Sequence, residues 1–130
     1  MDKLVKYPRA LFHASTLILI IFSLYPGNLA GFIMYGDLSA QPQLGRDYLN
    51  ISSNHFCIYA VISFLGFLSH YNDRKLKLII IYLFSLSVVL EFLHLIIPGR
   101  TFQIPDLTGN ILGVSSAGII ILIYKMWVKR

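Results

Sequence analysis

Long apolar stretches with few charges alternate with short polar segments along the whole chain. These stretches lie at about residues 10–26, 54–71, 78–97 and 107–127. Each is close to the roughly 20 residues with which an α-helix crosses the hydrocarbon core of a bilayer. Pro-Gly turn signals follow the first and the third stretch, at Pro26 and Pro98. The pattern predicts an all-α polytopic membrane protein, with four transmembrane helices in a single domain over residues 1–130.

The composition supports this prediction and narrows the function classes. Hydrophobic residues make up 56% of the chain and charged residues only 13%, whereas a soluble domain carries about 25% charged residues. This excludes a disordered chain and a soluble enzyme with an ordinary polar surface. Cys57 is the single cysteine of the sequence, so an internal disulfide and a paired-cysteine metal site are excluded as well.

The first stretch also resembles a signal peptide, because Lys3, Lys6 and Arg9 form a basic segment before it. The sequence after the apolar run lacks a small-x-small cleavage site: Asn28 occupies the −3 position before Ala30. We therefore interpret the first stretch as a retained signal-anchor helix.

The basic residues predict the orientation of the helices. Nine of the 11 lysines and arginines belong to three clusters, which precede the first stretch, separate the second from the third and follow the fourth. Only Arg46 and Arg100 belong to the other side. By the positive-inside rule the three clusters are cytoplasmic, so both termini are inside and the long segment 27–53 is outside. Because the net charge of +5 is concentrated in these clusters, it indicates topology and contact with anionic lipid, not nucleic-acid binding.

The long outer segment begins with apolar residues. Leu29–Tyr35 are apolar enough for a short interfacial helix, and Gly36, Pro42 and Gly45 argue against a longer one. We therefore expect a short helix followed by an irregular loop.

Glu91 is the main anomaly of the third stretch. An acidic side chain inside a membrane helix is costly and requires a partner. Ser87 and His94 lie four residues before and three residues after Glu91, on nearly the same helical face. The third helix should therefore carry a polar stripe that runs up to its outer end.

The fourth stretch has a matching face. Asp106 and Asn110 lie on it near the start of the helix, where the helix dipole favours a carboxylate. Gly109, Gly113 and Ala117 form a small-xxx-small ladder that allows another helix to approach closely. We expect this ladder to pack within the monomer, although packing against another subunit is an alternative.

Seven polar side chains from three helices and one tight loop should meet at the outer third of the membrane. They are His55, Tyr59, Glu91, His94, Arg100, Asp106 and Asn110. We expect Glu91 to accept hydrogen bonds from Tyr59, Asn110 or a histidine, and Arg100 to pair with Asp106. Two interpretations are open: a network that only holds the helices together, or a ligand-binding or catalytic site.

These residues resemble the signature of VanZ-like membrane proteins, in which a helix with Glu and then Gln or His is followed by Pro-Gly-Arg, Asp, Asn and Gly. The matching positions are Glu91, His94, Pro98, Gly99, Arg100, Asp106, Asn110 and Gly113. His55-Phe56-x-x-Tyr59 resembles the earlier motif of the family. The chain departs from the family where an Asp-Lys pair usually precedes the histidine, because Ile51 and Ser52 occupy those positions.

The resemblance implies a multi-pass protein of the bacterial inner membrane with a role in the cell envelope. The founding member of the family is associated with low-level teicoplanin resistance, and relatives occur beside envelope-polysaccharide and lipid genes. The resemblance supplies no established reaction.

Three functions follow as hypotheses. The first is binding of a lipid headgroup or a glycan-lipid, with Arg100 on a phosphate and Asp106, Asn110 and Tyr59 as further ligand-binding residues. The second is a membrane-embedded hydrolase or transferase, in which Glu91 acts as a base with His55 or His94. The third is a structural subunit of a membrane complex.

Membrane lipids and an envelope glycan or lipid-linked ligand are the expected partners, and no cofactor is expected. Glu91-x-x-His94 has the spacing of half a di-iron motif. Because the second half of that motif is absent from the sequence, no metal is expected either. The oligomeric state and the question of catalysis are left open.

Overall fold

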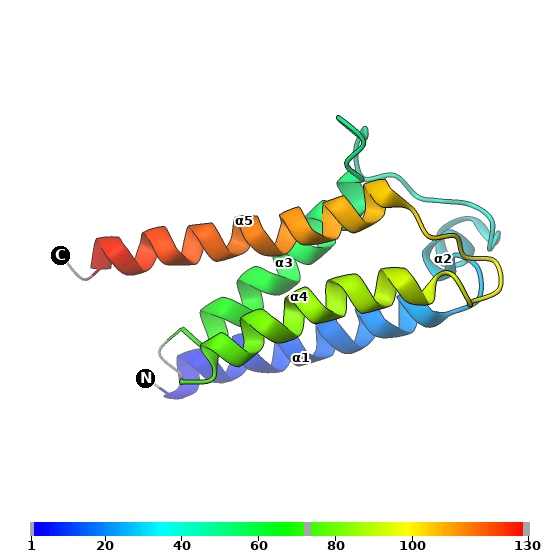
Figure 1. The fold of residues 1–130 in the computed structure, drawn as a ribbon. Coiled ribbons are helices and arrows are strands. Elements are labelled where there is room, and N and C mark those ends of the chain that lie inside the picture. Colours follow the sequence, from blue (N-terminus) through cyan, green and yellow to red (C-terminus); the bar gives the residue numbers. More distant parts are fainter. Residues whose placement is uncertain (1, 72–73, 129–130) are drawn as a thin grey trace.

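The computed structural model describes residues 2–71 and 74–128 and is all-α over these ranges, as predicted. Four long helices and one short helix follow one another along the chain (Figure 1). They are α1 (Asp2–Leu24), α2 (Leu29–Tyr35), α3 (Ser53–Ser69), α4 (Leu76–Leu93) and α5 (Ile104–Val128). Helix α3 packs most extensively, above all against α5 and α1, so it is the central element of the bundle.

Three of the helices are long and apolar enough to cross a membrane. They comprise Lys6–Leu24, Leu76–Leu93 and Ile104–Val128. Helix α3 is also apolar but has only 17 residues. Many large apolar side chains on the outer faces are exposed in the isolated chain, among them Leu17, Ile81 and Ile120. Such an exposed apolar surface is expected of a protein surrounded by lipid.

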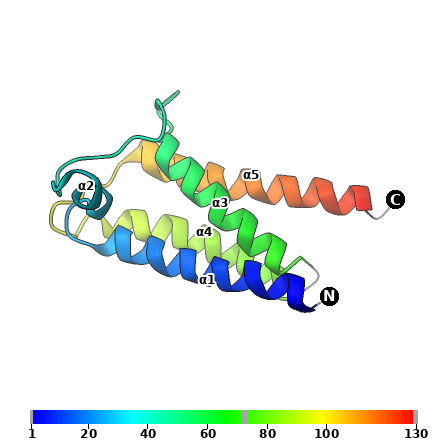
Figure 2. The same cartoon turned by 180° about the vertical axis from the view of Figure 1, so that it is seen from behind.

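The two ends of the bundle differ in charge. The start of α1, the start of α4 and the end of α5 lie at one end, whereas α2 and the long loops lie at the other (Figures 1 and 2). The three basic clusters of the sequence therefore lie at the same end, apart from Lys129 and Arg130, which lie outside the described residues. Arg46 and Arg100 belong to the opposite end, which we call the loop end.

The glycines of α5 allow α3 to approach closely. A Cβ atom at Gly109 would lie 2.7 Å from the Ser52 carbonyl oxygen, and one at Gly113 would lie 2.6 Å from the Phe56 carbonyl oxygen. Both distances are shorter than real Cβ contacts allow. The prediction that the ladder packs inside the monomer is therefore confirmed, and it sets the distance between the two helices that carry His55 and Asn110.

The predicted helix ends were wrong by several residues around the two turns of the loop end. Helix α4 ends at Leu93 instead of reaching residue 97. The backbone N–H groups of Leu95 and Ile96 donate to the carbonyls three residues before them, which gives tighter turns than an α-helix. Pro98 also disfavours helical geometry in the residue before it. Helix α5 begins at Ile104 instead of 107, since Pro105 fits the first helical turn.

The start of the long loop folds as predicted. The Asn28 side chain accepts a hydrogen bond from the Gly31 backbone N–H at 3.0 Å, and this bond caps the N-terminus of α2. Gly36 ends α2 with φ +72°, a conformation that favours glycine. The residues after Gly36 form an irregular loop up to α3.

The close approach of α3 and α5 predicts that Gly113→Ala is destabilising. The added methyl group would collide with the backbone of α3, and overpacking of this kind costs about 1–3 kcal/mol. The control is Gly118→Ala on the same helix, where a Cβ atom would lie 3.7 Å from the Phe67 ring, an ordinary contact. Thermal unfolding in detergent micelles should show a lower Tm for Gly113→Ala alone. Equal Tm values for the two variants would contradict the packing.

Candidate functional site

Two adjoining cavities lie at the loop end of the bundle. The inner cavity has a volume of about 130 Å³ and lies between the ends of α1, α3 and α4. The outer cavity, of about 320 Å³, is formed mainly by the loops and is lined largely by polar side chains. The residues that line both cavities are Asn28, Asn54, His55, His94 and Arg100. The two cavities therefore share a polar boundary and form one continuous candidate site.

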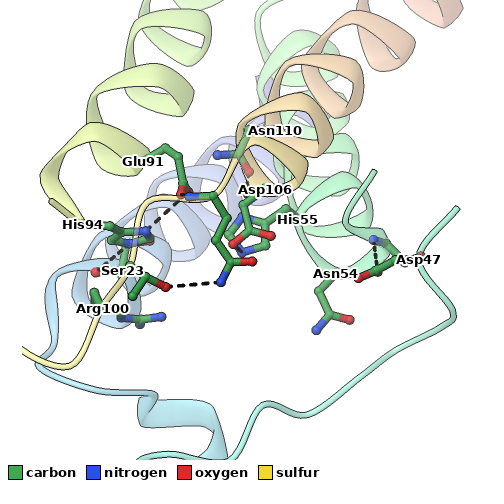
Figure 3. A network of polar contacts seen from close by, with 12 residues as sticks. Ser23, Asp47, Asn54, His55, Glu91, His94, Arg100, Asp106 and Asn110 are labelled. Carbon is green, nitrogen blue, oxygen red and sulfur yellow. Dashed lines mark hydrogen bonds and ion pairs between the residues drawn. The ribbon is translucent and has the colours of Figure 1, made fainter. Parts of the chain in front are cut away.

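Glu91 is the most deeply buried charged residue of the site. Its side chain is 1% exposed. One carboxylate oxygen, Oε1, accepts a hydrogen bond from the Gln103 backbone N–H at 3.0 Å, and Oε2 lies 3.4 Å from Nδ1 of His94 (Figure 3). Although Oε2 is within ion-pair distance of His94, it accepts no hydrogen bond from the described residues. The carboxylate thus joins the last turn of α4 to the segment that leads into α5.

His94 and Arg100 satisfy the free carbonyls at the end of α1. The last carbonyls of a helix have no partner within the helix. Nε2 of His94 donates to the Ser23 carbonyl at 3.2 Å, while the Arg100 guanidinium donates to the carbonyls of Phe22 and Tyr25. A carbonyl can only accept, so Nε2 of His94 carries a proton. These bonds attach the α4–α5 connection to α1.

A chain of hydrogen bonds fixes the orientation of His55. The Asn110 amide Nδ2 donates to the Ser87 carbonyl of α4 at 3.1 Å, so its Oδ1 faces α3. His55 Nδ1 lies 2.8 Å from that oxygen and must therefore be the donor. The other ring nitrogen, Nε2, lies 3.5 Å from Asp106 Oδ2 (Figure 3). The chain links α3, α4 and α5 and directs His55 Nε2 toward the Asp106 carboxylate.

The structure brings the seven residues singled out in the sequence to this one region. Six of them line the inner cavity, and Asp106 lines the outer one. Glu91 does contact a histidine, as expected, but its other partner is a backbone amide instead of Tyr59 or Asn110. The roles of the seven residues in catalysis or ligand binding stay predictions.

The expected ion pair between Arg100 and Asp106 was wrong. Among the described residues no carboxylate lies within ion-pair distance of Arg100. The guanidinium points instead to the α1 carbonyls, which need donors because that helix ends beside it. Burial lowers the pKa of Arg100, while Glu91 and Asp106 act to raise it. Arginine nevertheless stays protonated in proteins, so the site retains a positive charge without a directly paired anion.

Sequence reasoning missed the contributions of the long loop. The Asn54 amide Nδ2 donates to the Pro42 carbonyl and its Oδ1 accepts from the Leu44 backbone N–H, and both bonds hold the loop against α3. The Asp47 carboxylate accepts a hydrogen bond from the Ser53 backbone N–H at 2.9 Å and so caps α3. Figure 3 shows Asn54 and Asp47 on the side of His55 away from Glu91. No residue spacing in the sequence marks these contacts.

Both histidines of the site face amide, carboxylate or backbone carbonyl groups. Within the described ranges, neither His55 nor His94 hydrogen-bonds to a serine, threonine or cysteine side chain. The groups that converge here suit a ligand with charge and hydroxyl groups.

A comparison with family models identifies one family for nearly the whole chain. The model described as VanZ/LLP1 matches residues 9–128. None of the curated proteins and none of the solved structures matches the chain.

The contacts of Glu91 predict that two substitutions of this residue differ in their effect on stability. Glu91→Ala leaves the Gln103 N–H and the His94 ring without their buried partner, which costs about 1–3 kcal/mol for each lost group. Glu91→Gln retains an oxygen for the N–H and places an amide beside His94. Thermal unfolding should show a much lower Tm for Glu91→Ala and a nearly unchanged one for Glu91→Gln. A Glu91→Ala protein as stable as the unsubstituted chain would contradict the network.

Proposed function

The chain belongs to the VanZ/LLP1 family, and from this premise we propose that it binds the anionic headgroup of a membrane lipid or glycan-lipid in the cavities of the loop end. The protein is then a four-span component of the bacterial inner membrane. Its role in the cell envelope would concern envelope polysaccharide or resistance to glycopeptides such as teicoplanin.

Four spans and an outward-facing loop end fit the shape of the bundle. Helix α3 has 17 residues, which corresponds to a length of about 26 Å. It packs along α5 and α1, which supports its crossing the same layer as they do. The described residues of the basic clusters lie at the end of the bundle opposite the loop end. By the positive-inside rule that end is cytoplasmic, and the cavities then face the outer leaflet.

Arg100 is the observation that carries the proposal. It lines both cavities, and no carboxylate among the described residues lies within ion-pair distance of it. Two of its N–H groups donate to the carbonyls of Phe22, in the last turn of α1, and of Tyr25, which follows the helix, and a guanidinium offers five. The remaining donors suit a phosphate, which arginine binds through paired hydrogen bonds.

The surroundings of Arg100 suit the remainder of such a ligand. The outer cavity presents amide and hydroxyl groups that can bond sugar or glycerol hydroxyls, among them Asn28, Ser39, Asn54 and Thr101. The inner cavity adds apolar side chains, and exposed apolar faces of α1 and α3 begin nearby. A lipid could therefore place its headgroup in the cavities and its acyl chains along the helices.

Removal of the Arg100 charge should release the bound lipid. In Arg100→Gln, phosphorus-containing lipid that co-purifies with the protein, measured by phosphorus NMR of the extracted lipids, should fall at least tenfold, since a charge-assisted hydrogen bond contributes about 1.5–3 kcal/mol. Arg46→Gln is the control, because it removes an exposed charge at the same end and does not line either cavity.

A second readout separates binding from folding. Arg100 also caps α1, so the Tm of each variant is measured with its lipid content, and Arg100→Lys retains the charge with a single ammonium group. Loss of lipid from a folded Arg100→Gln protein supports the proposal. If the folded Arg100→Gln protein retains as much lipid as Arg46→Gln, headgroup binding by Arg100 is wrong.

A further inference from the structure

A histidine and two carboxylates from three different helices meet beside the cavities. They are His55 of α3, Glu91 of α4 and Asp106 of α5, and one ligand atom of each lies within 4.8 Å of the others. We propose that these three side chains form a binding site for one divalent transition-metal ion, of the zinc or manganese type. The sequence did not predict a metal, because Glu91-x-x-His94 is only half of a di-iron motif and the second half is absent.

The orientation of His55 is the first argument for this site. Asn110 Oδ1 accepts a hydrogen bond from Nδ1–H, so in the neutral ring Nε2 carries a lone pair, and this lone pair faces Asp106 Oδ2 at 3.5 Å. Two acceptors that face each other repel unless a cation or a proton lies between them. A metal-bound histidine characteristically donates its other N–H to an oxygen in this way, which fixes the ring for coordination.

The second, independent argument is the unpartnered oxygen of Glu91. Oε2 accepts no hydrogen bond from the described residues, although the side chain is 1% exposed. A buried carboxylate oxygen without a donor is costly. Its nearest basic neighbour is His94, whose Nε2–H already donates a hydrogen bond to the Ser23 carbonyl and whose Nδ1 lies 3.4 Å from Oε2. A cation near Oε2 would satisfy the oxygen.

The spacing of the three groups is close to that of a real site. Two protein ligands at about 2.1 Å from one ion lie roughly 3.0–3.4 Å apart in tetrahedral or octahedral geometry. The His55–Asp106 distance is already 3.5 Å, and the upper limit of 4.8 Å for the set requires small side-chain movements only. Asp106 is held at the first turn of α5 and Glu91 through Gln103, so the ligands are positioned before the ion binds.

The type of donor indicates the type of ion. Imidazole favours zinc and other first-row transition ions, whereas sites for magnesium and calcium consist of oxygen ligands. Two carboxylates would balance the two charges of the ion. The remaining coordination positions would face the cavities, so they would be open to water or to an anionic ligand.

Metal titration of the full chain, purified without an affinity tag and stripped with a chelator, tests the site. We expect one equivalent of zinc or manganese by elemental analysis and calorimetry, a rise in Tm with either ion, and at least tenfold weaker binding of magnesium and calcium. His55→Gln, Asp106→Asn and Glu91→Gln should each weaken zinc binding at least tenfold. Glu91→Gln retains the hydrogen bond to Gln103, so its loss of affinity would not result from misfolding.

Two controls make the outcome decisive. Asp37→Asn removes an exposed acid at the same end that lines neither cavity, and it should leave zinc affinity unchanged. His13→Gln removes an exposed histidine in the middle of α1 that lines neither cavity, and it should also have no effect. Absence of saturable zinc and manganese binding would mean that His55 and Asp106 share only a proton and would overturn the proposal. Equal zinc affinity in the three site variants and the controls would overturn it too. Neither result depends on whether a lipid binds Arg100.

Discussion

A carboxylate buried near the end of an apolar helix is the constraint around which the loop end of this protein is organised. Glu91 cannot be left without partners inside the bundle, because a buried charge is stable only when it is paired or hydrogen-bonded. Its Oε1 is bonded to the segment before α5, and its Oε2 faces His94, which in turn bonds to the end of α1. One acidic side chain thereby connects three parts of the chain.

The cavities follow from the same constraint. Because α4 stops at Leu93 and the chain turns sharply at Pro98 and Gly99, the donors of His94 and Arg100 reach the last carbonyls of α1. The close contact of α3 with the glycines of α5 places His55 against Asn110 and Asp106. These polar groups surround space that they do not fill, and this space forms the inner and outer cavities.

The sequence predicted the helices and the convergence of the polar residues, because both depend on regular spacing. Apolar stretches gave the helices, and positions three or four residues apart gave the polar faces that include Glu91 and Asp106. The helix ends near Pro98 and Pro105 were less predictable, since the irregular turns there are stabilised by tertiary hydrogen bonds. The partner of Arg100 could not be predicted either, because backbone carbonyls at a helix end leave no mark in the residue pattern. For the same reason the loop contacts of Asn54 were missed.

The contact between the Glu91 and His94 side chains can be tested most directly in a lipid bilayer. Solid-state NMR of the protein with ¹³C-labelled glutamate and ¹⁵N-labelled histidine detects a dipolar coupling between the Glu91 carboxyl carbon and His94 Nδ1 when the two are close. We expect this coupling, since Oε2 and Nδ1 are 3.4 Å apart, together with a protonated His94 Nε2. A Glu91 carboxyl group that shows contacts with lipid acyl chains, and none with His94, would contradict it.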